Sequence, residues 1–250
     1  MEAFDELWSG GPRFMQTGES FKLSTDSVLL ADFANMNRVK SCLDLGSGAG
    51  VLCILLAAKN PEATVAGIEL QPDFANLSRK NLTSNGFEDR THILTADLRD
   101  YKSLIAAESV DLVVSNPPYF AAHSGYSAPV SHRAFAREEK NCTLSDVCAA
   151  ARWALRWGGN FALVHRPERL SEIFCAMTEA GIEPKRLRMV AHSAEKAPSL
   201  VLIEGRRGGG KGLRIEAPLI LTDGTGNDSD EVQRIYRRGA YAPERKDGKL

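Results

Sequence analysis

The sequence predicts an α/β fold with a doubly wound, mostly parallel sheet of seven strands that includes an antiparallel edge strand. Short apolar segments alternate along the chain with longer segments of helical character, which is typical of such a sheet. Residues 112–114 are continuously apolar, as expected for a strand that is buried on both faces. A length of 250 residues, 43% of them hydrophobic and 25% charged, suits one large domain of this class.

The predicted elements follow in a regular order. A first helix is expected within residues 21–33, with Ser24 or Thr25 as its cap. The seven expected strands are residues 41–46, 63–70, 91–98, 110–119, 160–167, 186–193 and 198–205. The helices expected between them are residues 50–60, 72–86, 144–159 and 168–181. Proline opens the second of these helices and Asn-Gly closes it, while two glycines close the third.

Composition argues against several classes of protein. No segment approaches the roughly 20 apolar residues of a membrane span, and the acidic N-terminus has no signal-peptide pattern. Five cysteines without CxxC spacing indicate reduced thiols, with Cys42 and Cys53 in the core. We therefore expect a cytoplasmic protein without a metal site.

The net charge of −1 conceals an asymmetry between the two parts of the chain. Residues 152–250 carry 18 Lys and Arg against 13 Asp and Glu, and the basic residues cluster at 185–188, 206–214 and 234–238. Each cluster alone is typical of a solvated surface. Together they would suit a phosphate-bearing partner such as a nucleic acid.

The first expected strand ends in the segment LDLGSGAGV, residues 43–51. Glycines between a strand and a helix allow a tight turn and a close approach of a ligand to the backbone. The dinucleotide pattern G-x-G-x-x-G would need its third glycine at Val51, which argues against a nicotinamide oxidoreductase. Asp44 at the strand end would repel a pyrophosphate and suit a ligand with an amine or sulfonium charge.

Two more acidic residues end the next two strands. Glu69 follows the first glycine of the loop by 23 residues, a position at which a carboxylate can bind a ribose diol. Asp97 ends the third strand and could accept a hydrogen bond from an adenine amino group, although for this residue taken alone a helix cap or a turn is the better explanation. Three acids at the ends of three successive strands indicate a nucleoside site.

The segment VVSNPPYF, residues 113–120, places a polar side chain at the end of a buried strand. Pro117 fixes its own φ and favours an extended Asn116, so the Asn116 side chain leaves the sheet in a defined direction. A turn that merely ends the strand is the alternative interpretation.

These motifs resemble the class I S-adenosylmethionine-dependent methyltransferases of the NPPY type, over residues 20–220. DLGSGAG is similar to their glycine-rich loop, GIEL to their ribose-binding strand, TADL to their adenine contact, and NPPY to the signature of enzymes that methylate planar amino nitrogens. FKLSTDSVLLADF, FALVHRPERL and EAPLI resemble more closely the tRNA (adenine-N6)-methyltransferases that modify a valine tRNA beside its anticodon. Where that family has an ARHE-like stretch, this chain has AREE, which includes Arg137 and Glu138.

The resemblance implies a Rossmann-like core at residues 36–222. It also implies an extension at 1–35 whose helix lies over the cofactor site, and a polar tail at 223–250. The implied cofactor is S-adenosylmethionine and the implied partner is RNA, in particular tRNA. The implied cofactor contacts are Lys22, Thr25, Asp44, Gly46, Ser47, Gly48, Gly50, Glu69, Leu70, Asp97, Leu98 and Asn116. The implied substrate contacts are Pro118, Tyr119 and Arg137. We also expect Arg206 and Arg207 to contact the substrate, because GRRGGGKG, residues 205–212, indicates a basic hairpin loop next to the substrate groove and not a P-loop.

The expected chemistry follows from the nitrogen that is methylated. The lone pair of an exocyclic amino group is delocalised into its ring. The Asn116 Oδ1 atom and the Pro117 carbonyl could each accept one amino hydrogen and direct the lone pair toward the methyl group. Tyr119 would stack on a base that has left its helix.

Three other functions fit parts of the pattern. A protein-glutamine methyltransferase acting on a release factor shares NPPY, but usually carries a longer N-terminal domain than the roughly 40 residues that precede LDLG here. A guanine-N2 rRNA enzyme more often has phenylalanine at the position of Tyr119. A noncatalytic S-adenosylmethionine- or RNA-binding module would not need both motifs intact.

Overall fold

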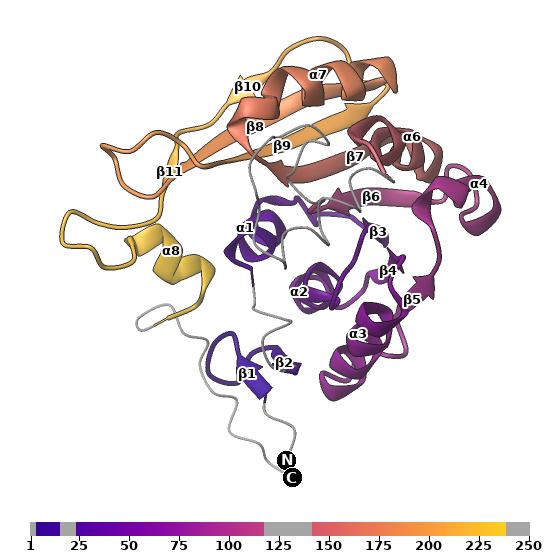
Figure 1. Ribbon diagram of the computed structural model, residues 1–250, viewed down its shortest axis with the longest axis horizontal. Coiled ribbons are helices and arrows are strands. Elements are labelled where there is room, and N and C mark those ends of the chain that lie inside the picture. Colours follow the sequence, from indigo (N-terminus) through magenta and orange to yellow (C-terminus); the bar gives the residue numbers. More distant parts are fainter. Residues whose placement is uncertain (1–3, 16–23, 118–141, 239–250) are drawn as a thin grey trace, which may run out of the picture.

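The computed structural model of the chain describes residues 4–15, 24–117 and 142–238, and within them lies a nine-stranded sheet. Its strand order is β10-β8-β9-β7-β6-β3-β4-β5, with β11 beside β8 (Figure 1). In chain order the strands are β3 (Ser41–Leu45), β4 (Thr64–Glu69), β5 (Thr91–Thr95), β6 (Val110–Ser115), β7 (Leu155–His165), β8 (Ile182–Ala191), β9 (Leu200–Arg207), β10 (Arg214–Ile215) and β11 (Leu219–Ile220). The predicted α/β class and its seven strands are confirmed, and β10 and β11 are two short additions.

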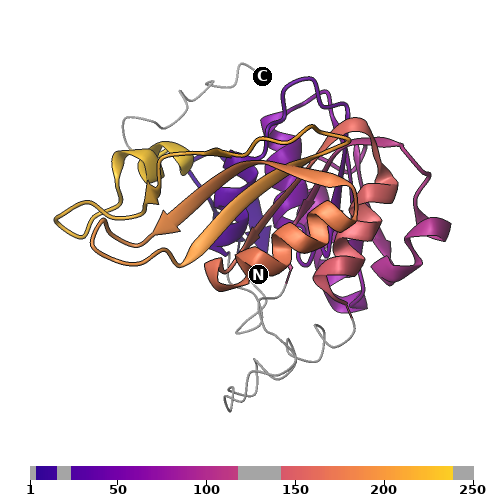
Figure 2. The same cartoon turned by 90° about the horizontal axis from the view of Figure 1, so that it is seen from above.

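Helices cover both faces of this sheet, so it is doubly wound (Figure 1). One face carries α1 (Thr25–Phe33), α2 (Val51–Lys59) and α3 (Pro72–Ser84), and the other carries α4 (Tyr101–Leu104), α6 (Leu144–Ala154) and α7 (Leu170–Glu179). Two hydrophobic clusters separate these layers. Leu112 and Val114 face one cluster while Val113 faces the other, so β6 is buried on both sides as predicted. Figure 2 shows the twist of the sheet from its orange to its purple strands.

The antiparallel strand lies inside the sheet and not at its edge, which corrects the prediction. β9 lies between β7 and β8 and is antiparallel to both. Residues 192–199 join β8 to β9 without a crossover helix, and a short connection returns the chain antiparallel beside the strand it left. The segment after β9 leads to β10 on the far side of β8, so residues 205–212 do not form the predicted hairpin loop.

The third predicted core helix is shorter than its sequence suggests. It was expected to reach residue 159, but α6 ends at Ala154 and β7 starts at once. The N–H of Ser109 donates to the Ala154 carbonyl at 2.9 Å, and Leu155 pairs with the first residue of β6. Gly158, at a φ of 77°, lies within β7 and does not cap a helix. Pairing with β6 therefore overrides local helical propensity here.

The N-terminal hairpin of β1 (Phe4–Glu6) and β2 (Arg13–Met15) is attached to α3 by two asparagine side chains. Asn85 accepts from the Arg13 N–H at 2.8 Å and donates to its carbonyl at 2.7 Å. Asn81 accepts from the Met15 N–H at 2.8 Å and donates to the carbonyl of Ala49 at 3.0 Å. The side chain of Asn81 thus connects the hairpin to the loop that precedes α2.

Part of the segment predicted as a polar tail is folded onto the core. It contains α8 (Asp230–Ile235), from which Val232 is buried against the same cluster as α1. Arg188 on β8 forms an ion pair with Glu231 at 2.7 Å. The predicted division into residues 1–35, 36–222 and 223–250 stays a prediction.

Helix α1 is fixed at its C-terminus by a lysine from α2. The Lys59 Nζ atom donates to the carbonyls of Ala31, Asp32 and Ala34 at 2.9, 2.7 and 2.9 Å. These carbonyls belong to the last turn of α1 and to the residue after it, where intrahelical donors are missing. Burial of Lys59 lowers its pKa.

We expect Lys59→Met to lower the free energy of unfolding by about 1–3 kcal/mol, because it leaves helix-end carbonyls without a donor. Chemical denaturation would measure the change. The matched control is Lys40→Met at an exposed position, expected to lie within about 0.5 kcal/mol of the wild type. An equal decrease in the free energy of unfolding in both variants would show that the hydrogen bonds of Lys59 do not stabilise the fold.

Candidate cofactor and substrate site

A glycine loop lies between β3 and α2 at the carboxyl edge of the sheet. Gly46, Gly48 and Gly50 have φ values of 78°, 52° and 84°, which favour glycine. A Cβ atom at Gly50 would lie 2.2 Å from the Oγ of Ser78, so α3 packs directly against this backbone. The Gly46 N–H donates to the carbonyl of Ile68 at 2.9 Å and ties the loop to β4. The sequence pattern therefore forms a close-approach turn, as predicted.

The Glu69 carboxylate holds this loop from the end of β4. Its Oε2 atom accepts from the Gly48 N–H and its Oε1 atom from the Gln71 N–H, both at 2.8 Å. The side chain is buried, with 7% exposure. A carboxylate oxygen accepts more than one hydrogen bond, so Glu69 retains capacity for ligand hydroxyls. The hydroxyl of Ser47, in the same loop, is buried and makes no hydrogen bond within the described part of the chain.

Asp44 is a fully buried acid beneath the loop. Its Oδ2 atom accepts from the Sγ of Cys53 at 3.6 Å, while its Oδ1 atom has no hydrogen-bond partner among the described residues. Burial raises the pKa of Asp44 from 3.8 to about 7, and the negative charge of Glu69 adds to the increase. A buried acid with an unsatisfied oxygen suits a cationic group of a ligand, which would supply the missing partner.

Asn116 follows β6 on the adjacent strand. Asp44 pairs in register with Val114, so Asp44 and Asn116 lie two residues apart along neighbouring parallel strands. The Nδ2 atom of Asn116 donates to the Oγ of Ser27 on α1 at 2.9 Å. The structure thus places the amide of Asn116 between the strand ends and α1.

Three further predicted cofactor contacts, Asp97, Leu98 and Leu70, differ in their burial and in their partners. Asp97 caps the 3₁₀ turn η2 (Leu98–Asp100) and forms an ion pair with Arg99 at 2.5 Å, which lowers the pKa of Asp97. Leu98 is half-buried against the α6 side of the core. Leu70, beside Glu69, is an apolar side chain with 48% exposure, as a surface that contacts a ligand ring would have.

Thr25 is the first residue of α1, but Ser24 and not Thr25 caps the helix, by accepting from the Asp26 N–H at 3.2 Å. The Thr25 hydroxyl forms a hydrogen bond with Tyr236. Pro117 is half-buried directly after Asn116. Four predicted site residues lie outside the described residues: Lys22, Pro118, Tyr119 and Arg137.

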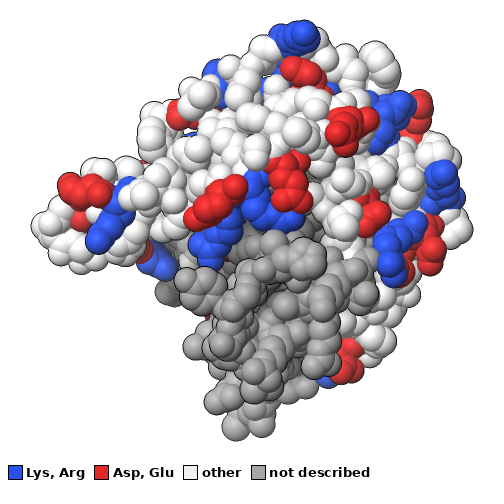
Figure 3. Space-filling model, turned by 45° about the horizontal axis from the view of Figure 1, so that its top comes forward, with Lys and Arg blue, Asp and Glu red and all other residues white. Residues whose placement is uncertain are grey.

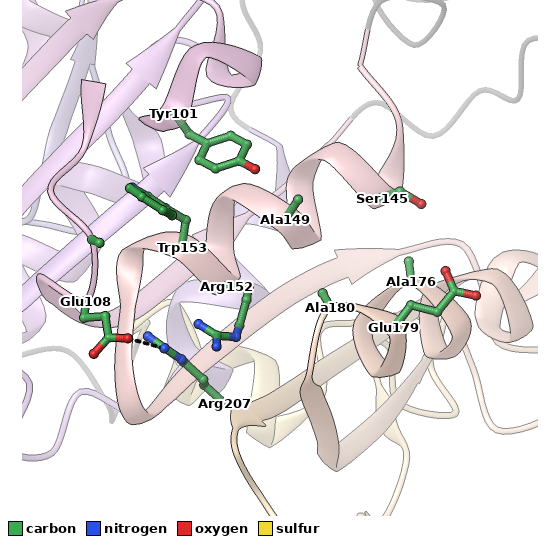
Figure 4. A pocket seen from close by; sticks show the side chains of 11 residues that line it. Tyr101, Glu108, Ser145, Ala149, Arg152, Trp153, Ala176, Glu179, Ala180 and Arg207 are labelled. Carbon is green, nitrogen blue, oxygen red and sulfur yellow. Dashed lines mark hydrogen bonds and ion pairs between the residues drawn. The ribbon is translucent and has the colours of Figure 1, made fainter. Parts of the chain in front are cut away.

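Arg206 and Arg207 are not brought together with Asn116. They end β9, whose end lies near the amino end of β6, while Asn116 follows the carboxyl end of β6. Arg206 donates to the carbonyl of Gly158 at 3.0 Å, and Arg207, whose side chain is 4% exposed, forms an ion pair with Glu108. Arg207 lines a pocket of about 630 Å³ between α6 and α7 that is separate from the glycine loop (Figure 4).

The basic clusters of the second part of the chain mostly face acidic partners within the fold. Ion pairs join Arg186 to Glu204, Arg188 to Glu231, Arg207 to Glu108, Arg214 to Glu216, Arg234 to Glu231 and Arg238 to Asp228. Figure 3 accordingly shows blue and red side chains side by side on the visible face. The charge excess therefore does not by itself mark a phosphate-binding surface.

Sequence reasoning missed three residues that shape the site. Ser27 contacts Asn116, Cys53 donates to Asp44, and Asn81 connects the N-terminal hairpin to the glycine loop. Ser27 and Cys53 lie inside apolar helical segments, and no local pattern distinguishes them from core residues. Their roles depend on how the helices dock on the sheet.

Two general properties concern the described part of the chain alone. No helix there is long and apolar enough to cross a lipid bilayer. No group of three or more His, Cys, Asp and Glu side chains is arranged there to hold a metal ion.

Asp44 gives a testable pH dependence of stability without any ligand. Its pKa is higher in the folded protein than in the unfolded chain, so its charge increasingly opposes folding as pH rises from about 4 to about 7. We expect Asp44→Asn to be more stable than the wild type above pH 7, by up to about 4 kcal/mol, and to lose that advantage near pH 4. Denaturation of both proteins between pH 4 and 8 measures this, and a difference that does not change with pH would contradict it.

Comparison with known proteins agrees with this geometry. The family model "Methyltransferase small domain" matches residues 22–179. The chain is 34% identical over 197 residues to a tRNA1(Val) (adenine(37)-N6)-methyltransferase of Porphyromonas gingivalis, covering 76% of each chain. It is 30% identical over 210 residues to the protein of the same name from Aeromonas hydrophila, covering 84% of this chain and 86% of that one.

Among solved structures, a predicted O-methyltransferase from Agrobacterium tumefaciens shares the fold. Its TM-score is 0.71 at 23% identity, over 88% of this chain and 100% of that chain. The chain belongs to the methyltransferase small-domain family and, within it, to the family of the tRNA1(Val) (adenine(37)-N6)-methyltransferases.

Proposed function

We propose that the protein transfers a methyl group from S-adenosylmethionine to the exocyclic N6 amino group of an adenine in tRNA. The observation that carries this proposal is the position of Asn116, whose carboxamide lies beside a glycine loop and a buried acid at one edge of the sheet. The names of the P. gingivalis and A. hydrophila relatives support adenine N6 of a valine tRNA as the target.

The described residues fit the proposed cofactor. The Oδ1 atom of buried Asp44, which has no hydrogen-bond partner among the described residues, suits the positive charge of the methionine part. Glu69 retains acceptor capacity for the ribose hydroxyls, and the exposed side chain of Leu70 offers an apolar surface to the adenine. When bound, S-adenosylmethionine supplies an electrophilic methyl group on its sulfonium. Gly46, Ser47, Gly48, Gly50, Asp97, Leu98, Thr25 and Lys22 complete the proposed cofactor contacts.

The role of this chain in the reaction is to position the amino nitrogen and orient its lone pair. In the proposed mechanism the Asn116 Oδ1 atom and the Pro117 carbonyl each accept one hydrogen of the amino group. These hydrogen bonds hold the nitrogen in place and favour a geometry in which its lone pair is available. Pro117 has no N–H of its own to compete, and its fixed φ orients its carbonyl. The chemistry needs no nucleophilic side chain.

Tyr119, Pro118 and Arg137 remain the proposed substrate contacts on the basis of the sequence alone. Tyr119 would stack on the extruded base, an interaction worth about 1–3 kcal/mol. Arg206 and Arg207 are less suitable than the sequence suggested, because their guanidinium groups contact Gly158 and Glu108 at the other end of the sheet.

A substrate panel tests the proposal directly. Purified protein with radiolabelled S-adenosylmethionine would be offered unmodified total tRNA, ribosomal RNA and release factor in parallel. We expect label in tRNA, recovered as N6-methyladenosine after digestion. Label in release factor or as N2-methylguanosine in ribosomal RNA would retain the amino-nitrogen chemistry and overturn the substrate.

Asn116→Ala tests the mechanism. It removes an acceptor that acts on the amino group, so we expect kcat to fall by at least about 100-fold while the Kd for S-adenosylmethionine stays within about threefold. Single-turnover assays and calorimetry would measure the two quantities. Asn37→Ala, at an exposed position before the sheet, is the matched control and should leave both unchanged. Turnover by Asn116→Ala near the wild-type rate would refute the mechanism.

A further inference from the structure

We propose that Ser27 is a positioning residue that helps to hold the Asn116 carboxamide with its Oδ1 end toward the amino group to be methylated. The inference deepens the proposed function and rests on it. Ser27 lies in the first turn of α1, far in sequence from Asn116, and is not among the site residues that the sequence implied. It acts through Asn116 and not on the substrate.

The evidence is a direct contact in a buried setting. The Asn116 Nδ2 atom donates to the Ser27 Oγ atom at 2.9 Å, which is an ordinary hydrogen-bond length. Ser27 is 8% exposed, and its neighbours Val28 and Leu29 are buried in the core. Because water has little access to Ser27, replacing it by alanine would remove a hydrogen-bond partner of this amide nitrogen that water does not readily replace.

The orientation of the amide decides its chemistry. A carboxamide has an acceptor end, Oδ1, and a donor end, Nδ2, which exchange places when the group rotates by about 180°. Only Oδ1 can accept a hydrogen from the substrate amino group, whereas Nδ2 would present its own hydrogens to it. With Nδ2 held at Ser27, Oδ1 lies on the other side of the group, as the proposed mechanism requires.

Helix α1 provides a rigid support for this contact. The Ser24 side chain caps its first turn, and Lys59 binds the carbonyls at its other end. Both ends of the helix are therefore fixed independently of Asn116. The position of the Ser27 hydroxyl is set by the docking of α1 and not by the strand that carries Asn116.

The test compares Ser27→Ala with Ser103→Ala, which removes a serine hydroxyl on α4 that donates to the Asp100 carbonyl on the other face of the sheet. We expect Ser27→Ala to lower kcat by about tenfold, the effect of losing one orienting hydrogen bond, with the Kd for S-adenosylmethionine unchanged. Ser103→Ala should leave kcat unchanged. Ser27→Thr, which keeps the hydroxyl, should restore kcat to within about threefold of the wild type.

Measuring Ser27→Ala in a second variant, Asn116→Asp, distinguishes an effect on the orientation of the amide from a general effect on the structure of the site. In Asn116→Asp both oxygens are acceptors, so the group has no wrong end, and Ser27→Ala should then change kcat by less than about twofold. An equal effect of Ser27→Ala in both backgrounds, or a wild-type kcat for Ser27→Ala, would overturn the inference. If Asn116→Ala is inactive while Ser27→Ala is fully active, the inference alone fails. If Asn116→Ala is active, the proposed mechanism fails together with the inference. The proposed function fails if the wild type does not label tRNA in the substrate panel.

Discussion

The parallel pairing of β4, β3 and β6 is the constraint on which the rest of the site depends. Parallel strands in register end at the same edge of a sheet, so residues separated by about 70 positions in sequence become neighbours. Asp44 is the last residue but one of β3, Glu69 is the last residue of β4, and Asn116 directly follows β6. A slip of one residue in any strand would turn its polar group to the opposite face.

Burial gives these polar groups their chemical character. Glu69 is stabilised because both of its oxygens accept backbone N–H groups from the loops it joins. Within the described part of the chain Asp44 has one weak thiol donor, and its raised pKa reflects the cost of burying a charge. Both oxygens of Glu69 therefore have hydrogen-bond donors, whereas one oxygen of Asp44 has none among the described residues and could be paired by a cationic ligand group.

The same packing explains why charge clusters in the sequence are poor guides to partners. Arg186 and Arg188 belong to one basic cluster, yet each finds a carboxylate on a different element, Glu204 on β9 and Glu231 on α8. The pair of Arg188 and Glu231 is bidentate, which the planar and always charged guanidinium group of arginine favours. A cluster of basic residues in the sequence therefore does not show which acidic residues its members will pair with in the folded protein.

The sequence by itself determined the α/β class, the seven principal strands and the motif residues, because hydrophobic periodicity, helix-ending residues and glycine turns act locally. It did not determine that α6 ends at Ala154, that β9 lies inside the sheet, or that Arg207 is buried against Glu108. Those outcomes depend on strand pairing and on contacts between distant residues. The contact between Ser27 and Asn116 is of the same kind, because the docking of α1 on the sheet brings the two side chains together. Local sequence patterns do not predict that docking.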